Sequence, residues 1–239
     1  MGREVYQIAR EVRDKFNALY QIRDQVQQQQ KETIVISYSS ETEASLIIPE
    51  LITFQARFPT VHLVLKYQPW DEDTVAALSS QHADYGIILR PNLNDHLSVL
   101  AEWPDALIVV MSKNASLTVV NDMSPFILPP HSPDSLREMV DQLFLSVHGH
   151  PPVSFMEIDS VDGLKHVVTA TNRPAIMLQS SVVEELASGK FALAVLRGFP
   201  FVCPHVLCCP PQSTQNTSLA FRAFTGYFKQ LYSRNNRTK

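Results

Sequence analysis

The chain has 239 residues and a formal net charge of minus 4, from 20 Lys and Arg against 24 Asp and Glu, and 45% of its residues are hydrophobic. This composition is typical of a globular protein and excludes a disordered or fibrous chain. Three cysteines are too few for a disulfide scaffold. No apolar run reaches the roughly 18 residues needed to span a bilayer, and the amino terminus lacks an apolar signal core. We therefore expect a cytoplasmic protein with no membrane partner.

Glycine is scarce, with seven residues at positions 2, 86, 149, 163, 189, 198 and 226. No two of them are close enough to form a glycine-rich loop around a phosphate. The dinucleotide and Walker A fingerprints are therefore excluded, and we expect no cofactor.

The amino-terminal segment has a pattern of its own. Apolar side chains recur at heptad spacing between Val5 and Val26, and four glutamines at 27–30 follow. This seam predicts a linker or dimerisation helix over residues 1–32, roughly 40 Å long at about 1.5 Å per residue, that packs on a partner helix. A helix that crosses the core is the alternative interpretation.

Beyond Thr33, short β-type runs alternate with helical segments, which is the rhythm of a parallel sheet covered by helices. Strands are expected at 34–38, 61–67, 85–89, 106–111, 126–128, 153–158, 175–178 and 205–209. Helices are expected at 42–58, 73–81, 135–147, 161–169 and 217–232. Two α/β lobes fit this series of elements better than one continuous sheet.

Four segments share their order and spacing with one known family: Gly2-Arg3-Glu4-Val5, the stretch 34–59, Asp84-Tyr85-Gly86-Ile87-Ile88, and Glu184-Glu185-Leu186-Ala187-Ser188-Gly189-Lys190. In this order they resemble the linker helix and effector-binding region of the bacterial LysR-type transcriptional regulators. The resemblance covers nearly the whole chain and begins where that family's winged helix-turn-helix has just ended.

The resemblance implies a fold of two Rossmann-like lobes of periplasmic-binding-protein type, joined by two crossover strands, with a small-molecule effector in the cleft. Lobe I would comprise residues 33–104 plus 205–239, and lobe II residues 105–204. The resemblance also implies a homodimer or homotetramer in which regulatory domains pair side by side and antiparallel. Contact with DNA would occur only through a DNA-binding domain missing from this chain.

One turn departs from the family pattern. The residues Thr169-Ala170-Thr171-Asn172-Arg173-Pro174 stand where the family commonly has a glycine-rich turn. Because this turn is stiffer and bulkier, Asn172 and Arg173 could crowd or recharge a standard effector pocket.

Ligand contacts are expected where strands end and helices begin, because helix amino termini present free N–H groups there. In the resembled family the first such turn contacts the effector, and here it is Ser39-Ser40-Glu41-Thr42. Its hydroxyls can cap the helix or bind an anion. The negative charge of Glu41 argues against a simple carboxylate effector.

The other candidate effector contacts are Arg90, His131, Ser132, Ser160 and Phe201. Each also has an ordinary structural interpretation. The two serines can be N-caps, the arginine and histidine can be solvated, and the phenylalanine can pack in the core. For His131 the functional interpretation is a ligand donor whose charge changes near neutral pH.

Charge is unevenly distributed along the chain. Residues 1–33 carry six bases and five acids, residues 34–220 nine and 19, and residues 221–239 five and none, giving plus 1, minus 10 and plus 5. A body at minus 10 repels nucleic acid, and we interpret the basic tail as a solvated terminus. DNA affinity must therefore come from elsewhere.

Catalysis is disfavoured. There is no Gly-x-Ser-x-Gly nucleophile elbow. His148 and His150 flank a glycine but lack a third ligand at zinc spacing, so no metal site is expected. The triplet Asp71-Glu72-Asp73 precedes a helix, where negative charge favours the helix dipole.

Two alternatives remain open. A solute-binding receptor of similar fold would need a secretion signal and no heptad helix. A cysteine-based redox sensor of the same family would use Cys203, Cys208 and Cys209. Adjacent Cys208 and Cys209 on a strand would point to opposite faces, so buried apolar cysteines are the preferred interpretation.

Overall fold

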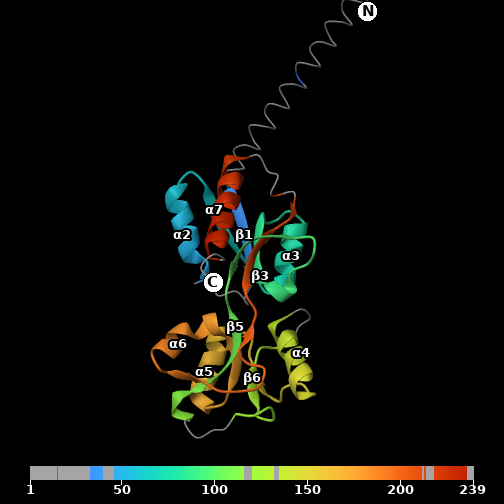
Figure 1. The fold of residues 1–239 in the computed structure, drawn as a ribbon, viewed down its shortest axis with the longest axis vertical. Coiled ribbons are helices and arrows are strands. Elements are labelled where there is room, and N and C mark those ends of the chain that lie inside the picture. Colours follow the sequence, from blue (N-terminus) through green and yellow to red (C-terminus); the bar gives the residue numbers. More distant parts are fainter. Residues whose placement is uncertain are drawn as a thin grey trace, which may run out of the picture.

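The computed structural model describes residue 15 and residues 33–39, 46–115, 120–131, 135–211, 213 and 218–235. Within these, the chain forms two α/β lobes that lie one above the other along the long axis (Figure 1). The predicted linker helix lies outside the described residues apart from Lys15, and so do Ser40, Glu41, Thr42 and Ser132.

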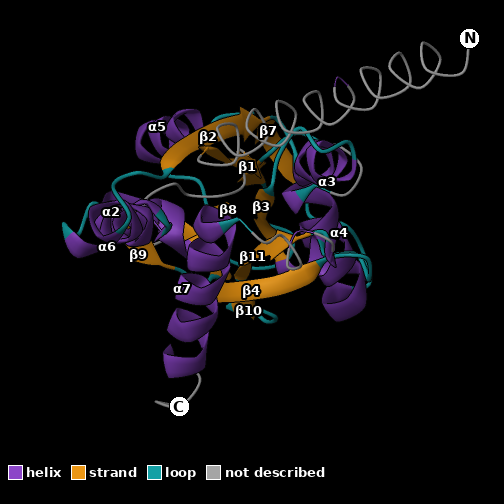
Figure 2. Ribbon diagram, turned by 90° about the horizontal axis from the view of Figure 1, so that it is seen from above, coloured by secondary structure: helices purple, strands orange, loops and turns teal. Residues whose placement is uncertain are grey.

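Lobe I is built on a five-stranded sheet in the order β2-β1-β3-β11-β4. Its strands are β1 Thr33–Ser39, β2 His62–Gln68, β3 Tyr85–Leu89, β4 Ser98–Trp103 and β11 His205–Cys209. Its helices are α2 Ile48–Arg57, α3 Asp71–Ser79 and α7 Leu219–Asn235. Helices α2 and α7 pack on one face of the sheet and α3 on the other (Figures 1 and 2).

Successive side chains of a strand point to opposite faces of the sheet, so the core of lobe I is divided between these two faces. Tyr85 packs under α2 and α7, and its ring centroid lies 4.5 Å from that of Phe224. Ile88 and Cys208 face the other way, against α3. Helices therefore cover both faces of the central strands, as in most α/β proteins with parallel strands.

Lobe II is built on a six-stranded sheet in the order β10-β5-β8-β6-β7, with β9 also paired to β5. Its strands are β5 Ala106–Ser112, β6 Phe126–Leu128, β7 Ser154–Glu157, β8 Ala175–Leu178, β9 Phe191–Leu193 and β10 Phe201–Val202. Its helices are α4 Leu136–His148, α5 Val161–Thr171 and α6 Val183–Ala187. Phe144 of α4 covers one face of the sheet and Val168 of α5 the other.

The predicted two-lobed α/β fold is confirmed, but the sheets are mixed. β1 lies parallel to β2 and β3, and β6 lies parallel to β7 and β8. The strands that cross between the lobes, β4, β5 and β11, pair antiparallel with their neighbours. The lobe boundaries themselves stay a prediction. Among the described helices, none is both long and apolar enough to cross a bilayer.

The two crossings of the chain meet at one buried carboxylate. Asp105 lies between β4 and β5, and its side chain accepts hydrogen bonds from Nε2 of His205, over 3.0 Å, and from the hydroxyl of Ser180. His205 begins β11, directly after the second crossing. The N–H of Cys203 also donates to the carbonyl oxygen of Asp105 over 3.0 Å. Hydrogen bonds through Asp105 thus join both crossings to lobe II.

Candidate functional site

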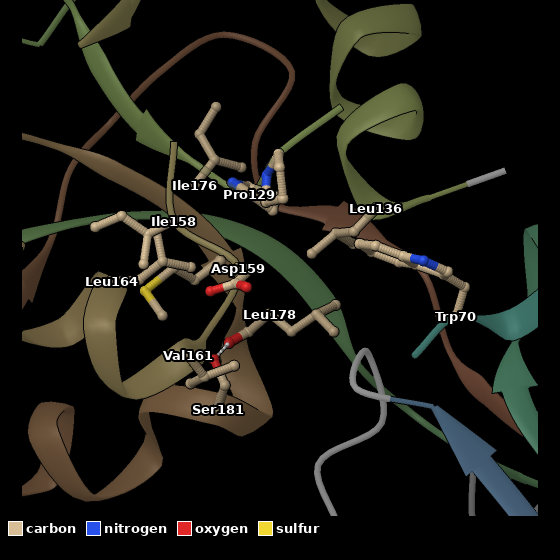
Figure 3. Close-up of a pocket in the computed structure, with 12 residues that line it drawn as sticks. Trp70, Pro129, Leu136, Ile158, Asp159, Val161, Leu164, Ile176, Leu178 and Ser181 are labelled. Carbon is tan, nitrogen blue, oxygen red and sulfur yellow. Dashed lines mark hydrogen bonds between the residues drawn. The ribbon is translucent and has the colours of Figure 1, made fainter. Parts of the chain in front are cut away.

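A pocket lies between the lobes, at the carboxyl ends of β6, β7 and β8 (Figure 3). Lobe I contributes Trp70, the residue before α3. Lobe II contributes a largely apolar wall: Pro129, Pro130, Leu136, Ile158, Asp159, Val161, Leu164, Ile176, Met177, Leu178 and Ser181. A crevice beyond the carboxyl ends of parallel strands is the usual ligand position in open α/β sheets.

The pocket is small in the described conformation. Its cavity volume is about 60 Å³, and a single water needs about 10–15 Å³ on this kind of measure. The pocket therefore holds a few waters or a small organic group. A larger molecule fits only if the lobes or the lining side chains move.

The polar side chains of the lobe II wall, Asp159 and Ser181, offer hydrogen-bond acceptors. The carboxylate of Asp159 points into the pocket just before α5 begins (Figure 3). The hydroxyl of Ser181 donates its proton to the carbonyl oxygen of Leu178 over 2.7 Å, so its oxygen can accept a further bond. No described residue in the lining carries a positive charge.

Arg137, in the first turn of α4, is a buried cation next to this wall. Its guanidinium donates to Asp141 over 2.8 Å, to Glu157 over 2.7 Å and to the carbonyl oxygen of Pro129 over 3.2 Å. Burial acts to lower the pKa of Arg137, but the two carboxylates outweigh it and raise that pKa above its usual value. The guanidinium is therefore charged, and two carboxylates balance it.

Asp71 is fully buried on the lobe I side of the cleft. Its carboxylate accepts hydrogen bonds from the Ser39 hydroxyl, from the N–H of Leu89 over 2.8 Å and from the amide of Asn92 over 2.9 Å. Burial raises the pKa of Asp71 above its usual value, and these bonds only partly offset it. Beyond lying at a helix start, as its sequence position predicts, Asp71 ties β1, β3 and the turn after β3 together.

None of the described candidate effector contacts lines this pocket. Ser39 donates to Asp71, and Ser160 caps α5 by accepting the N–H of Gly163 over 3.1 Å. Arg90 is half-exposed and pairs with Glu102 at 2.7 Å. As contacts for an effector, these residues stay predictions.

His131 and Phe201 lie elsewhere as well. His131 is exposed, with Nε2 3.8 Å from a carboxylate oxygen of Asp141. Phe201 lines a separate, wider groove of about 410 Å³ between the turn at Pro91 and the exposed side of α4. Neither residue is brought to the pocket beside Trp70.

The turn that departs from the family pattern lies at the far end of α5 from the pocket. Asn172 is the C-cap of this helix and adopts the left-handed conformation, with φ 54°. The guanidinium of Arg173 stacks on the ring of Phe155, 3.8 Å from its centroid. Neither Asn172 nor Arg173 lines this pocket, so they do not crowd it, and their effect on an effector stays a prediction.

None of the lining residues had been singled out as a contact from the sequence, and Trp70 and Asp159 are the two whose positions could have been weighed. Asp159 directly follows the expected strand 153–158, and Trp70 comes three residues after the expected strand 61–67. The rule that ligands lie beyond strand ends therefore applies to both. The prediction favoured serine and threonine residues at turns of this kind, because their hydroxyl groups can bind a ligand. An aromatic residue shortly after a strand, such as Trp70, was the sequence signal that could have indicated this contact.

The histidines and cysteines considered as metal or redox sites lie in contacts that suit a structural role. His148 and His150 both approach Asp122, at 3.6 and 3.3 Å. The described residues contain no group of His, Cys, Asp and Glu side chains arranged to hold a metal ion. Cys208 and Cys209 are buried outside any disulfide, and they pack on opposite faces of the lobe I sheet as predicted.

Comparison with known families agrees with this fold. The LysR substrate binding domain family matches residues 27–233. The chain therefore belongs to the LysR family of transcriptional regulators, of which it contains the substrate binding domain.

A transcriptional regulator of the RuBisCO operon from Acidithiobacillus ferrooxidans is 31% identical over 115 residues, which are 44% of this chain and 37% of that protein. The match thus spans little more than a third of that regulator.

Solved structures share the fold. The regulatory domain of CcmR from Synechocystis PCC6803, in complex with 2-PG, superposes with a TM-score of 0.66 at 14% identity, over 84% of this chain and 97% of that one. Full-length CbnR complexed with its target DNA superposes with a TM-score of 0.66 at 13% identity, over 91% of this chain and 79% of that one.

Proposed function

We propose that this chain is the effector-sensing and oligomerisation region of a DNA-binding transcriptional regulator, and that a small metabolite binds in the pocket between the lobes. The observation that carries the proposal is the composition of the pocket, in which Trp70 of lobe I faces a wall made by lobe II. A ligand there touches both lobes, so its affinity depends on their relative position. The complex of the CcmR regulatory domain with 2-PG supports a small ligand in this fold.

The relay to DNA follows from the same arrangement. A ligand that binds one arrangement of the lobes better shifts the equilibrium toward it. The lobes turn about the two crossings, where Asp105, Ser180 and His205 are hydrogen-bonded. We expect the change to pass through the linker segment to DNA-binding domains elsewhere in the regulator, which acts in the cytoplasm and catalyses no reaction. The structure of full-length CbnR on its target DNA supports this arrangement.

Pairing of two copies has support in the open sheet edges. β2 is an edge strand of the lobe I sheet, and β7 is an edge strand of the lobe II sheet. Seen down the long axis of the molecule, both strands lie on the same side (Figure 2). Each exposes apolar side chains, with Tyr67 60% and Met156 43% accessible. Unpaired apolar edges are sites where another chain can add, so a homodimer or homotetramer would cover them.

A thermal-shift screen of metabolites against the purified chain tests the proposal. A ligand at 100 times its dissociation constant stabilises the folded state by about 2.7 kcal/mol. Trp70→Ala should weaken binding of any hit at least about tenfold, whereas Tyr67→Ala, on a β2 residue outside the pocket, should not. If no metabolite stabilises the chain, or if Trp70→Ala leaves affinity unchanged, the site is wrong.

The sequence-predicted contacts are tested with the same hit. Ser39→Ala combined with Ser40→Ala should weaken binding if the first turn contacts the effector. Because Ser39 donates to Asp71, the variant's own stability is measured first, without ligand. Unchanged affinity in a folded double variant would remove these serines from the site.

Redox sensing is the alternative within this family, and the cysteine environments disfavour it. Burial raises the pKa of the Cys208 thiol and raises that of Cys209 to about 11. Thiolates are the reactive form, so these thiols are inert in the folded chain near neutral pH. A solute-binding receptor would share the two-lobed fold, but the match to the LysR substrate binding domain over residues 27–233 favours a regulator.

A further inference from the structure

We infer that the effector is an amine, with an apolar body that packs against Trp70 and Leu136 and an ammonium group that pairs with Asp159. This inference rests on the proposed function, because it names the class of ligand for the same pocket. It goes beyond that function because it predicts that the ligand is positively charged, and this charge can be tested separately.

The first argument is the hydrogen-bonding character of the lining. The Asp159 carboxylate has only acceptor atoms, and the Ser181 hydroxyl has already donated its proton to the Leu178 carbonyl oxygen. A ligand that bonds to these two groups must therefore bring the donors. An ammonium group brings three donors and a charge opposite to that of Asp159.

The second argument is the charge around the pocket. Arg137, the buried cation beside the wall, is balanced by Asp141 and Glu157. Lys165 of α5 pairs with Glu185 at 3.0 Å, and both side chains are largely buried. With no described cation in the lining, a carboxylate or phosphate would meet the charge of Asp159 uncompensated. Such like-charge contact disfavours an anion.

The third argument is Trp70. Its half-buried indole is the lobe I contribution to the pocket, and it lies across from the lobe II wall that bears Asp159 (Figure 3). The face of a tryptophan ring attracts cations more strongly than that of any other side chain. The same ring packs well on an apolar body. Both of its interactions thus suit an organic amine.

The helix start beside Asp159 does not reverse this preference. In the first turn of α5, the N–H of Gly163 is taken by the Ser160 hydroxyl over 3.1 Å. Asp159 and Asp162 place two carboxylates at the positive end of this helix dipole. An incoming anion would compete with groups that already occupy that end.

Three probes of similar shape and different charge test the inference: benzylamine, benzyl alcohol and benzoate. At pH 7 the amine is a cation, the alcohol is neutral and the benzoate is an anion. Binding is measured by titration calorimetry and by the perturbation of protein NMR resonances. We expect benzylamine to bind at least about tenfold more tightly than benzyl alcohol, and benzoate to bind more weakly than either.

Asp159→Asn and Asp162→Asn form a matched pair of variants. Both remove one negative charge near the start of α5, but only Asp159 lines the pocket. Asp159→Asn should abolish the preference for benzylamine and leave benzyl alcohol unchanged. Asp162→Asn should leave all three affinities unchanged, which excludes a general attraction of cations to an acidic surface.

The outcomes separate this inference from the proposed function. Benzoate binding more tightly than benzylamine, or benzylamine keeping its preference in Asp159→Asn, would overturn the amine class. Failure of all three probes would overturn it as well, while the proposed function would still stand if another metabolite binds and depends on Trp70. Failure of the whole metabolite screen would refute both.

Discussion

The side chain of Asp105 accepts four hydrogen bonds at the crossings. One carboxylate oxygen accepts the N–H groups of Ala106 over 2.8 Å and Ser180 over 3.1 Å, and the other accepts the Ser180 hydroxyl and His205 Nε2. Asp105→Asn replaces an acceptor by a donor and leaves buried donors unpaired. We expect the free energy of unfolding in urea to fall by about 3 kcal/mol. Asp95→Asn, at an exposed acid, should change it by less than about 0.5 kcal/mol.

The contribution of Asp105 should depend on pH. Burial opposes ionisation of this carboxyl, but the hydrogen bonds from His205 and Ser180 outweigh it and hold its pKa below the ordinary value. Because the folded-state pKa is the lower one, the stabilisation is present above the unfolded pKa of about 3.9 and is lost as pH falls through the folded pKa. The difference between wild type and Asp105→Asn in urea unfolding should therefore be largest near pH 7 and shrink below about pH 4. A difference that grows on acidification would contradict this assignment.

The cysteines should be unreactive in the folded chain. All three are buried, and burial raises the pKa of Cys209 to about 11. At pH 8 we expect a thiol reagent such as DTNB to label them only slowly, and to label all three at once when the chain is unfolded in denaturant. Rapid labelling under native conditions, or a disulfide formed with mild peroxide and seen by mass spectrometry, would restore the redox interpretation.

At the scale of elements, Gly86 sets how closely α3 approaches β3. A Cβ at this position would lie 2.8 Å from a methyl carbon of Leu78 and 2.9 Å from one of Thr74. Both neighbours are buried in the packed helix, so Gly86→Ala should destabilise the chain by about 1–3 kcal/mol. Gly226→Ala is the matched control, because nothing lies within 4 Å of its new Cβ inside α7. That substitution should instead stabilise by up to about 1 kcal/mol. If both substitutions changed the free energy of unfolding in the same direction, measured by thermal or urea unfolding, the packing argument would be contradicted.

Most elements of this chain could be predicted from local pattern, and β4 shows where that fails. Strands such as β3 are short apolar runs between turn residues, which is a local signal. β4 follows a polar loop, and among the described strands it pairs only with β11, about a hundred residues later in the sequence. The antiparallel pairing of the crossover strands is likewise set by the path of the chain between lobes, which no local window contains.

The sequence allowed the position of the candidate site to be predicted better than the residues that line it. The rule of strand ends leads to the correct kind of turn, but Trp70 joins the pocket only because lobe II lies opposite it. The burial of Asp71 also depends on tertiary structure, since Ser39, Leu89 and Asn92 come from three different segments. Within a run of three acids, nothing local distinguishes the buried one.

At the scale of the molecule, the open edges of β2 and β7 should govern assembly. Tyr67→Glu and Met156→Glu each place a charge on one exposed apolar edge, and each should shift the chain toward monomers because burying an unpaired charge is costly. Val195→Glu, at a residue 93% accessible outside both edges, is the control. Sedimentation or light scattering at several protein concentrations gives the mass. Unchanged association in both edge variants would place the interface elsewhere.

The hydrogen bond between the N–H of Cys203 and the carbonyl oxygen of Asp105 makes lobe II a self-contained insert. The entire six-stranded sheet lies between Ala106 and Val202, and its two ends meet where that bond is made. A segment whose ends lie together can be exchanged for another without moving the framework that receives it. The apolar wall and Asp159 would travel with the insert, while Trp70 and the terminal helix would remain behind. The β7 edge would travel with the insert as well, while the β2 edge would stay. Exchange of a whole lobe would therefore change the pocket wall and one of the two sheet edges together, whereas a point substitution changes only one of them.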